Sequence, residues 1–522
     1  MTHPKLVAAM SSPAFYPTHP ETVELVQTHI SFVFMAGDMV YKVKKAVDFG
    51  FLDFTSLEKR KHYCLEEVRL NRRLAPNVYL DVVEIWENGD GEIVLGSGKC
   101  VVEYAVRMRR LPMERMLKKI IAKDDFDPAL LDTVAEKLVD FHNNAAMGGA
   151  IDETGGLEAI RRNHEENFSQ TEKYIGITIP GYQYNFISGY DRRFLKQNGE
   201  LFQKRVQEHR IRDCHGDLHL EHIVMGDEIA IFDCIEFNER FRFGDVAAEV
   251  AFLAMDLDFN GYLAYADRFV ESYTKYSRDR EIPVLLNFYR CYYAYVRGKV
   301  VSFRLDDPSI APYDREAAKT MASRYFDLAY TYSARLQRPT LLLMTGLMGT
   351  GKSVIAKGIA PRLGAVILQT DVLRKELLGI VPTERHYEAF GDGIYGEEMS
   401  RKTYDETLRR AVAHLEAGRS VIIDASYKRR AEREKTLDAA RGIGAAYYIV
   451  ECTCPEEVVK ERLDARMSSA DEASDGRWDI YLAQKSDFDP VAEVDRSVHI
   501  VADTSMPPEQ ATAAVLEATS HR

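Results

Sequence analysis

The sequence predicts an α+β half with two lobes, followed by an α/β half built on a parallel sheet. Short segments with β character surround one helical segment in roughly the first 110 residues, and helical periodicity dominates the stretch that follows. From residue 340 onward, apolar strand-like runs alternate with helical segments, which is typical of a parallel sheet. A polar break that ends in proline, Arg335–Pro339, separates the halves. We therefore expect one domain over residues 1–338, with a small lobe to about residue 110, and a second domain over 339–522.

Composition places the chain among ordinary globular proteins. A length of 522 residues is enough for about two to four domains, and 46% hydrophobic with 29% charged residues is typical of such proteins. The formal net charge of −13 argues against a nucleic-acid or anionic-membrane partner. No apolar stretch has membrane-spanning length, the N-terminus lacks the features of a secretory signal, and the seven cysteines form no C-x-x-C pair. These features predict a cytoplasmic protein with free thiols, and they leave the oligomeric state open.

The small lobe is expected to be an antiparallel sheet with one inserted helix. Five segments have β character, and the helix is expected over Leu57–Leu74. In the second lobe, Asp127-Pro128 has the form of a helix start, and apolar residues recur behind it at helical spacing. The five β segments are 29–37, 39–47, 81–88, 92–98 and 100–108.

Two acidic segments of the second lobe carry chemistry. Cys214–His222 contains Asp217, and Ile231–Asn238 contains Asp233. A hairpin that turns at Gly226-Asp227 would bring these two aspartates to the same end. Phosphoryl transfer needs such a pair, because one carboxylate must orient and deprotonate the attacking hydroxyl while another holds Mg²⁺ on the nucleotide phosphates.

The most specific motif is G-x-x-x-x-G-K-S at Gly346–Ser353. Its glycines allow backbone N–H groups to face phosphate oxygens, Lys352 supplies a positive charge for the β- and γ-phosphates, and the Ser353 hydroxyl can coordinate Mg²⁺. An apolar run precedes the motif and a helical segment follows it, so the helix N-terminus points at the anion. The residues expected to bind nucleotide here are Gly346, Gly349, Thr350, Gly351, Lys352 and Ser353.

Two further strands of this half are expected to end in carboxylates. The strand Ala365–Thr370 is followed by Asp371, a candidate base for an acceptor hydroxyl, and Arg374 is placed to hold a phosphate. The strand Ser420–Ser426 contains Asp424, which is placed where a carboxylate would help to hold Mg²⁺.

Basic residues follow these strands. Arg462 and Arg466 precede a Ser/Asp-rich segment that could act as a lid, so they are candidates for stabilising transition-state charge. Other basic residues follow Asp424, and the alternative for several of them is a solvated helix face: Lys428, Arg429, Arg430 and Arg433.

The run His215-Gly216-Asp217-Leu218-His219 resembles the H-G-D-x-H loop of aminoglycoside phosphotransferase-like (choline kinase-like) enzymes, which are relatives of protein kinases. The resemblance spans roughly residues 28–332, and only this loop is specific. It implies a bilobal protein-kinase-like fold in which Asp217 is the catalytic base and Asp233 a metal ligand. We expect Asp245 to anchor the catalytic loop through hydrogen bonds rather than to take part in the chemistry, and we expect His219 to serve the structure of that loop.

The same resemblance assigns a lysine and a glutamate to nucleotide binding. Lys42 looks like the lysine that pairs with phosphates, with Lys44 and Lys45 as alternatives on the same strand. Glu67, or its neighbour Glu66, would be the ion-pair partner of that lysine.

The chain departs from the family in two places. The family has asparagine as a second metal ligand where this chain has His222; either His222 binds the metal, or that metal site is weakened, or Glu221 or Glu236 substitutes for it. The chain also has no obvious glycine-rich loop before its first strands.

Residues 341–501 resemble small P-loop kinases of the polynucleotide 5′-kinase, zeta-toxin and gluconate-kinase type, in which an aspartate after the second strand is the base. The fused order resembles bacterial proteins that join an aminoglycoside phosphotransferase-like domain to a P-loop ATP-binding domain. It implies a bifunctional enzyme that binds Mg²⁺-ATP in both halves and phosphorylates hydroxyls of small molecules. Two alternatives stay open: a P-loop kinase regulated by an N-terminal ligand-binding pseudokinase, and a nucleic-acid 5′-end kinase.

Overall fold

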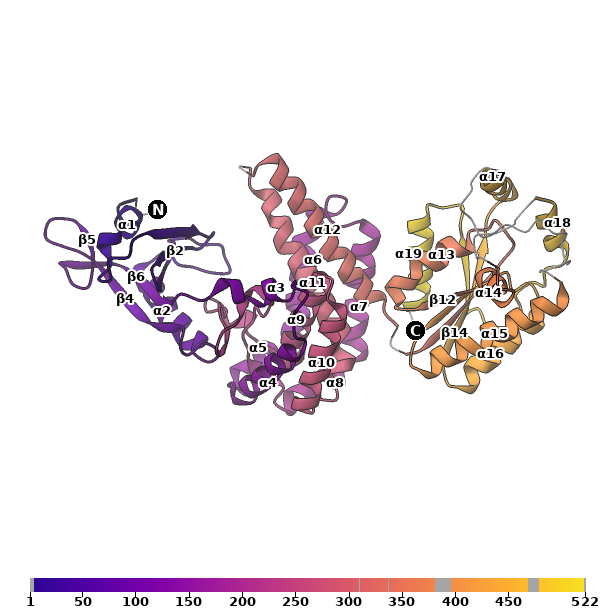
Figure 1. Ribbon diagram of the computed structural model, residues 1–522, viewed down its shortest axis with the longest axis horizontal. Coiled ribbons are helices and arrows are strands. Elements are labelled where there is room, and N and C mark those ends of the chain that lie inside the picture. The colour runs from indigo at the N-terminus through magenta and orange to yellow at the C-terminus, as the bar shows by residue number, and fades with distance from the viewer. Residues whose placement is uncertain (1–3, 309, 337, 381–395, 468–477, 521–522) are drawn as a thin grey trace. The chain divides into compact units, whose positions relative to one another are not determined.

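The computed structural model describes residues 4–308, 310–336, 338–380, 396–467 and 478–520 (Figure 1). The chain forms two compact units, Met1–Glu172 with Arg192–Asp307, and Lys173–Asp191 with Pro308–Arg522. The second unit thus includes two stretches that precede residue 339, namely 173–191 and 308–338. The expected domain boundary between residues 338 and 339 stays a prediction. Among the described helices, none is both long enough and apolar enough for a bilayer crossing.

Unit 1 begins with a six-stranded antiparallel sheet whose strand order is β1-β2-β3-β6-β4-β5. Each of the five expected β segments overlaps one of the strands β2 to β6, and β1 was not expected. Helix α2 (Leu57–Asn71) is inserted between β3 and β4, and the Ser56 hydroxyl caps it by accepting the Lys59 N–H. The strands are β1 (Val23–Gln27), β2 (Ser31–Ala36), β3 (Met39–Lys44), β4 (Tyr79–Glu87), β5 (Ile93–Leu95) and β6 (Cys100–Arg109).

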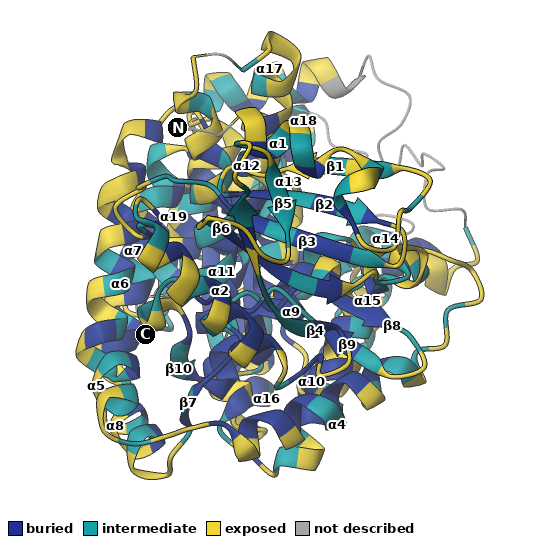
Figure 2. Cartoon of the chain, turned by 90° about the vertical axis from the view of Figure 1, so that its left-hand side faces the viewer, coloured by how far each residue is buried: buried dark blue, intermediate teal, exposed yellow. Residues whose placement is uncertain are grey.

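The alternation of side chains along β3 assigns its residues to two faces. Tyr41 and Val43 belong to a core shared with α1 (Pro4–Met10), whereas Val40 belongs to the core under α2. Lys42 and Lys44 follow Val40 at spacing two, so both lysines lie on the α2 face. Figure 2 shows β3 largely buried, in agreement with its burial pattern.

The rest of unit 1 is mostly helical and contains two small antiparallel ribbons, β7 with β10 and β8 with β9. The expected hairpin is confirmed: Ile223 pairs with Ile231 and Met225 with Ile229. Helix α9 is buried almost all round, as its nearly continuous apolar sequence predicts. The ribbons are β7 (Ile211–Asp213), β8 (Ile223–Met225), β9 (Ile229–Ile231) and β10 (Phe243–Asp245); the helices are α3 (Leu117–Ile120), α4 (Ala129–Asn144), α5 (Ala150–Gly155), α6 (Leu157–Thr171), α8 (Gly199–Gln207), α9 (Val246–Phe259), α10 (Leu263–Ser277) and α11 (Ile282–Phe303).

Unit 2 is built on a five-stranded parallel sheet of order β12-β13-β11-β14-β15. Helices α15 and α16 bury their apolar residues against one face, and α13 and α19 lie on the other (Figure 1). The three strands expected from sequence are β11, β12 and β13, and the sheet continues with β14 and β15. The strands are β11 (Thr340–Thr345), β12 (Val366–Gln369), β13 (Val421–Asp424), β14 (Ala446–Thr453) and β15 (His499–Asp503); the helices are α13 (Lys352–Leu363), α14 (Thr370–Leu377), α15 (Glu397–Glu416), α16 (Arg430–Gly442), α17 (Glu456–Met467), α18 (Trp478–Ser486) and α19 (Pro508–Ser520).

Two upstream helices pack with this sheet domain, the first part of α7 (Gly181–Gln197) and α12 (Pro312–Ala334). Asp327 of α12 accepts hydrogen bonds from Gln183 at 3.1 Å and from Arg362 of α13 at 2.9 Å. The Phe186 and Tyr330 rings meet edge to face with centroids 5.0 Å apart. The polar contacts of Asp327 therefore join α12 to α7 and to α13, and the aromatic contact joins α7 to α12.

The basic residues after Asp424 serve the fold. Arg433 is completely buried: its guanidinium contacts the carboxylate of Glu493 and donates to the carbonyl oxygens of Tyr427, Asp489 and Pro490. Arg433 is therefore not a solvated residue but holds the segment before β15 against α16. Lys428 and Arg429 bind Asp487, and Arg430 pairs with Glu434 along the surface of α16.

Replacing Arg433 by methionine should destabilise unit 2 by about 3–5 kcal/mol, because the buried Glu493 carboxylate would lose its partner. The measurement is denaturant unfolding of the full chain, followed by a probe in unit 2. Arg430→Met is the matched control, since this exposed arginine of the same helix should change stability little. Equal stability of the two variants would contradict the structural role of Arg433.

Candidate functional site

The first candidate site lies where the β8–β9 hairpin begins and ends. Asp217 precedes β8 and Asp233 follows β9, as the hairpin prediction requires, and His222 lies between them. The His222 Nδ1 is 2.8 Å from the Asp217 carbonyl oxygen, and its Nε2 is 3.7 Å from Asp233 Oδ2. One largely buried imidazole thus lies between the Asp217 backbone carbonyl and the Asp233 carboxylate.

A chain of ion pairs joins this hairpin to the small lobe. Lys42 Nζ lies 2.8 Å from Asp233 Oδ1 and 2.8 Å from Glu67 Oε1. The second oxygen of Glu67 is 2.6 Å from Lys44 Nζ, and Lys44 also contacts Glu236. Lys42 is therefore the lysine next to Asp233. Lys44, on the same face of the strand, pairs instead with Glu67 and Glu236.

The neighbouring alternatives point elsewhere. Glu66 pairs with Arg69 at the surface of α2, and Lys45 Nζ donates to the Thr28 carbonyl oxygen at 2.6 Å. Glu221 pairs with Lys118, and Glu236 is paired with Lys44, so each of the carboxylates considered as a substitute metal ligand already faces a lysine.

The charges in this site stabilise one another. Burial alone would lower the pKa of Lys42, but the charges of Asp233 and Glu67 outweigh it and raise that pKa well above its ordinary value. Burial opposes ionisation of Asp217, yet the hydrogen bond from His219 and the charge of His222 lower its pKa to about 2. The pKa of Asp233 is lowered too, because the Lys42 charge outweighs burial. At neutral pH the site therefore presents two carboxylates and a protonated lysine.

Glu249 anchors the loop that carries Asp217. From helix α9, its Oε1 accepts the backbone N–H of His215 at 2.7 Å and of Gly216 at 2.8 Å. Its Oε2 is 2.7 Å from His142 Nε2, and the other nitrogen of that ring is 2.7 Å from the Tyr273 hydroxyl. His142, Cys214 and Glu249 lie close enough to hold a metal ion, but both nitrogens of His142 already have hydrogen-bonding partners, so we interpret the group as a structural network.

Asp245 was the residue expected to anchor this loop. The structure instead places it at the N-cap of α9, where it accepts the Ala247 N–H at 2.8 Å and pairs with the buried Arg205. Sequence reasoning missed Glu249, although a lone acidic residue in the first turn of an otherwise apolar helix is a signal that could have found it. His219 accepts the Glu221 N–H at 3.3 Å, which is consistent with the structural role in the loop that we expected for it.

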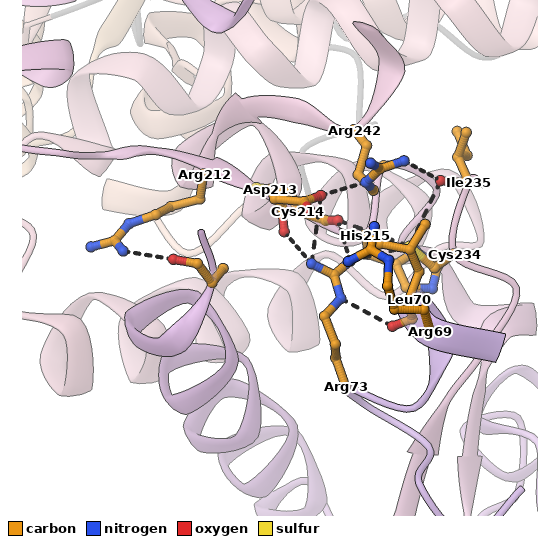
Figure 3. A network of polar contacts seen from close by, with 12 residues as sticks. Arg69, Leu70, Arg73, Arg212, Asp213, Cys214, His215, Cys234, Ile235 and Arg242 are labelled. Atoms are coloured by element: carbon orange, nitrogen blue, oxygen red, sulfur yellow. Dashed lines mark hydrogen bonds and ion pairs between the residues drawn. The ribbon is translucent and has the colours of Figure 1, made fainter. Parts of the chain in front are cut away.

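The same loop is held from the small lobe by Arg73, just beyond α2 (Figure 3). The Arg73 guanidinium donates to the carbonyl oxygens of Asp213 at 2.6 Å, Cys214 at 2.9 Å and Leu70 at 3.0 Å. Arg242 binds the Asp213 carboxylate and donates to the Ile235 carbonyl oxygen at 2.8 Å. These two arginines connect α2, the loop before Asp217 and the segment after Asp233.

The second candidate site is the phosphate-binding loop between β11 and α13. Gly346, Gly349 and Gly351 have φ values of 129°, 77° and 86°, which L-residues rarely adopt. A Cβ on Gly346 would lie 2.5 Å from the Cys452 carbonyl oxygen, so this position also excludes a side chain sterically. Lys352 Nζ donates to the carbonyl oxygens of Gly346 and Leu347 at 2.9 and 2.8 Å, and thus lies over the loop.

Two carboxyl groups lie beyond the carboxyl ends of β12 and β13, where parallel sheets bind ligands. Asp424 ends β13 and accepts a hydrogen bond from Gln369, its partner in register on β12, at 3.0 Å. Asp371, in the first turn of α14, lies 3.4 Å from Arg374. Burial and the nearby Asp424 raise the pKa of Asp371, and the charges of Arg374 and Lys352 offset only part of this effect.

The remaining predicted residues of this site are distributed as follows. Ser353 lies in the first turn of α13 and is partly exposed, and the Thr350 hydroxyl donates to the Leu347 carbonyl oxygen at 2.8 Å. Arg462 donates to the Thr504 carbonyl oxygen at 2.6 Å, and the Thr504 hydroxyl in turn donates to the Thr350 carbonyl oxygen at 2.7 Å. Arg462 is thus bound to the chain behind the loop. The Arg466 side chain and the Ser/Asp-rich segment expected to be a lid lie outside the described residues.

Comparisons with known proteins agree with the second site. The family model AAA_33, an AAA domain, matches residues 341–491. A solved structure of a choline/ethanolamine kinase family protein from Mesorhizobium loti is 12% identical in sequence; the match covers 62% of this chain and 99% of that chain, with a TM-score of 0.35. A gluconokinase from Sinorhizobium meliloti 1021 is 20% identical; the match covers 35% of this chain and 94% of that chain, with a TM-score of 0.26. At these scores neither likeness carries a functional conclusion.

The fold and the glycine loop define a P-loop nucleotide-binding domain fused to an α+β domain with its own lysine–carboxylate cluster. Over 486 residues the chain is 30% identical to the uncharacterized protein Rv2004c of Mycobacterium tuberculosis (strain ATCC 25618 / H37Rv), covering 91% of this chain and 94% of that protein. The chain belongs to the same family as this mycobacterial protein.

Replacing Glu249 by glutamine should destabilise unit 1 by about 1–3 kcal/mol, because an amide cannot accept from both backbone N–H groups and from His142 as the carboxylate does. Chemical denaturation of the full chain measures this effect. The control is Glu271→Gln on the exposed face of α10, which should leave stability nearly unchanged. If Glu249→Gln unfolds like the wild type, Glu249 does not hold the loop.

Replacing Gly346 by alanine should severely weaken nucleotide binding by unit 2, because the added Cβ cannot coexist with the Cys452 carbonyl oxygen. Gly364→Ala is the control for a positive φ: at its φ of 66° the left-handed conformation costs an L-residue about 1–2 kcal/mol, but no atom lies within 4 Å of the added Cβ. Binding of a fluorescent ATP analogue to each variant is the measurement. Equal binding by the two variants would show that the contact with Cys452 does not matter for nucleotide binding.

Proposed function

We propose that this protein is a phosphotransferase with two centres, each of which moves the γ-phosphoryl group of Mg²⁺-ATP to a hydroxyl of a small molecule. The observation that supports the first centre is the contact of Lys42 with both Glu67 and Asp233, beside Asp217. The second centre is supported by the glycine loop, whose Lys352 lies at the same sheet edge as Asp371 and Asp424.

In the first centre each residue has a separate task. Asp217 is ionised throughout the physiological pH range and orients the acceptor hydroxyl, taking its proton as the new P–O bond forms. Lys42 is held by Glu67 and faces the phosphate oxygens. Asp233 is a carboxylate that would fit a divalent cation on the nucleotide phosphates, and His222 lies beside it. The bound ion supplies positive charge that offsets the phosphate negative charge.

In the second centre the backbone does most of the binding. The loop and the N-terminus of α13 would hold phosphate oxygens, and Lys352, which lies over the loop, would supply positive charge to them. Ser353 and Asp424 offer the oxygen ligands that Mg²⁺ prefers. Asp371 has a raised pKa, which suits a group that takes a proton from the acceptor, and Arg374 lies beside it to hold the transferring phosphate.

One observation favours a regulatory role for unit 1 as the second candidate. The turn between β1 and β2 contains no glycine and is closed by its own hydrogen bonds: the Thr28 N–H donates to the Ser31 carbonyl oxygen at 3.0 Å, and the Thr28 hydroxyl accepts the Ser31 N–H at 2.9 Å. These groups are not available to phosphates. In this alternative, unit 1 binds a ligand without turning it over and controls the P-loop domain.

The two possibilities differ in how phosphorylated products depend on each centre. We expect products from a library of hydroxylated metabolites, with a 5′-hydroxyl oligonucleotide included, to fall into two sets. One set should drop about 10²- to 10⁴-fold in Asp217→Asn, which loses the base, and the other should drop at least as far in Lys352→Ala. Incorporation of labelled γ-phosphate, measured on the full chain, separates the sets.

Matched controls are available on the same elements. Asp227→Asn changes an exposed aspartate at the hairpin turn, and Lys357→Ala changes an exposed lysine of α13; neither should change any product. If every product depends on Lys352 and none on Asp217, the regulatory role is correct. If neither variant lowers any product, the proposed activity is wrong, and an oligonucleotide product lost in Lys352→Ala would identify the nucleic-acid 5′-end kinase.

A further inference from the structure

His222 occupies a position from which it can bind a metal ion with one defined nitrogen. Its Nδ1 is 2.8 Å from the Asp217 carbonyl oxygen, and a carbonyl oxygen can only accept, so Nδ1 carries the hydrogen. In the neutral ring the lone pair then lies on Nε2, which faces Asp233.

This arrangement is the one that metal-binding histidines use. Such a residue usually donates its other ring N–H to a carbonyl or carboxylate, which fixes the tautomer and the ring orientation. The His222 side chain is only 13% exposed, and the His219 ring packs on it with a centroid distance of 3.8 Å. The ring is therefore held in place before any ion binds.

The distance between Nε2 and Asp233 Oδ2 suits a shared ion. Two ligand atoms about 2.1 Å from one ion lie between about 3.0 and 4.2 Å apart, depending on the angle at the metal. The observed separation of 3.7 Å falls within this range. Asp233 is also held in an unusual backbone conformation, with a φ of 63°, which directs its carboxylate toward both Lys42 and His222.

The neighbouring groups limit the site to two protein ligands. Asp217, His219 and His222 together lie close enough to hold a metal ion. However, His219 accepts the Glu221 N–H on Nδ1, so its Nε2 carries a hydrogen and faces Asp217 Oδ2 at 3.6 Å. The nitrogens nearest to Asp217 thus carry hydrogens rather than lone pairs. One imidazole and one carboxylate remain, and nucleotide phosphates and water would complete the coordination.

This ligand pair determines which ions fit. Mg²⁺ is a hard ion that prefers oxygen and near-ideal octahedral geometry, whereas imidazole suits first-row transition ions. A closed zinc site would need more protein ligands. Mn²⁺ accepts carboxylate, phosphate and water oxygens and also imidazole nitrogen. We propose that His222 and Asp233 make the centre in unit 1 selective for a borderline divalent cation of the Mn²⁺ type over Mg²⁺, an inference that rests on the proposed nucleotide binding by unit 1.

The test uses the full chain with Lys352→Ala, which weakens the P-loop centre, and a non-hydrolysable ATP analogue. Binding of Mn²⁺ is measured from the free-ion electron paramagnetic resonance signal, and competition by Mg²⁺ gives the preference. We expect the bound Mn²⁺ to show nitrogen modulation from an imidazole in pulsed measurements. His222→Asn should remove that modulation and reduce the preference for Mn²⁺ over Mg²⁺ by about tenfold or more.

His62→Asn, an exposed histidine on α2, is the matched control and should keep both the modulation and the preference. Bound Mn²⁺ without imidazole nitrogen, or an unchanged preference in His222→Asn, would overturn the inference while leaving nucleotide binding intact. The other negative outcome is that Asp233→Asn weakens no nucleotide-dependent binding of Mn²⁺ or Mg²⁺. That result would contradict both the proposed function of unit 1 and this inference. Normal unfolding of His222→Asn excludes loss of the fold as the cause.

Discussion

The structure of unit 1 depends on one buried charge. Glu67 has no solvent exposure, and it stays ionised only because Lys42 and Lys44 lie on either side of it. Each of these ions costs several kcal/mol to remove from water, so the arrangement is stable only when all partners are in place. The members of this cluster come from three parts of the chain: the two lysines from β3, Glu67 from α2, and Asp233 and Glu236 from the segment after the hairpin. A single set of ion pairs therefore sets the position of α2 on the sheet and of Asp233 beneath it.

The loop before Asp217 is held by two side chains of opposite charge. Arg73, beyond the end of α2, binds its carbonyl oxygens, whereas Glu249 of α9 binds its N–H groups. Both polar sides of the same backbone are thus satisfied by buried or half-buried side chains, which leaves the loop little freedom to shift. Because Arg73 lies directly after the helix that carries Glu67, a movement of α2 would disturb the loop of Asp217 and the ion pairs of Asp233 together. The two ends of the hairpin are in this way positioned by one element.

Much of this could be predicted from sequence, but only where the signal is local. The glycine loop, the hairpin and the period-two spacing of Lys42 and Lys44 depend on residues close together in the chain, and each is found in the structure. The choice between Glu66 and Glu67 could not be made, because adjacent residues of a helix differ by 100° in direction and only the packed helix shows which one faces the sheet. The pairing of Arg433 with Glu493 joins residues sixty positions apart, and no local pattern marks it. Glu249 lies between these cases, since its apolar surroundings mark it as unusual but do not identify its partners.

The two proposed centres would hold an anion in different ways. In unit 2 the proposed centre is the glycine loop: three glycines with positive φ shape it, and a Cβ on Gly346 or Gly349 would clash with neighbouring atoms. In unit 1 the turn between β1 and β2 uses the Thr28 and Ser31 N–H groups internally, so the proposed centre there relies on side-chain charge and on a cation. Backbone dipoles act on any phosphate regardless of the ion, whereas a centre that relies on Lys42, Asp233 and His222 depends on which ion is bound. The replacement of a hard oxygen ligand by an imidazole therefore matters more in unit 1 than it would beside a glycine loop.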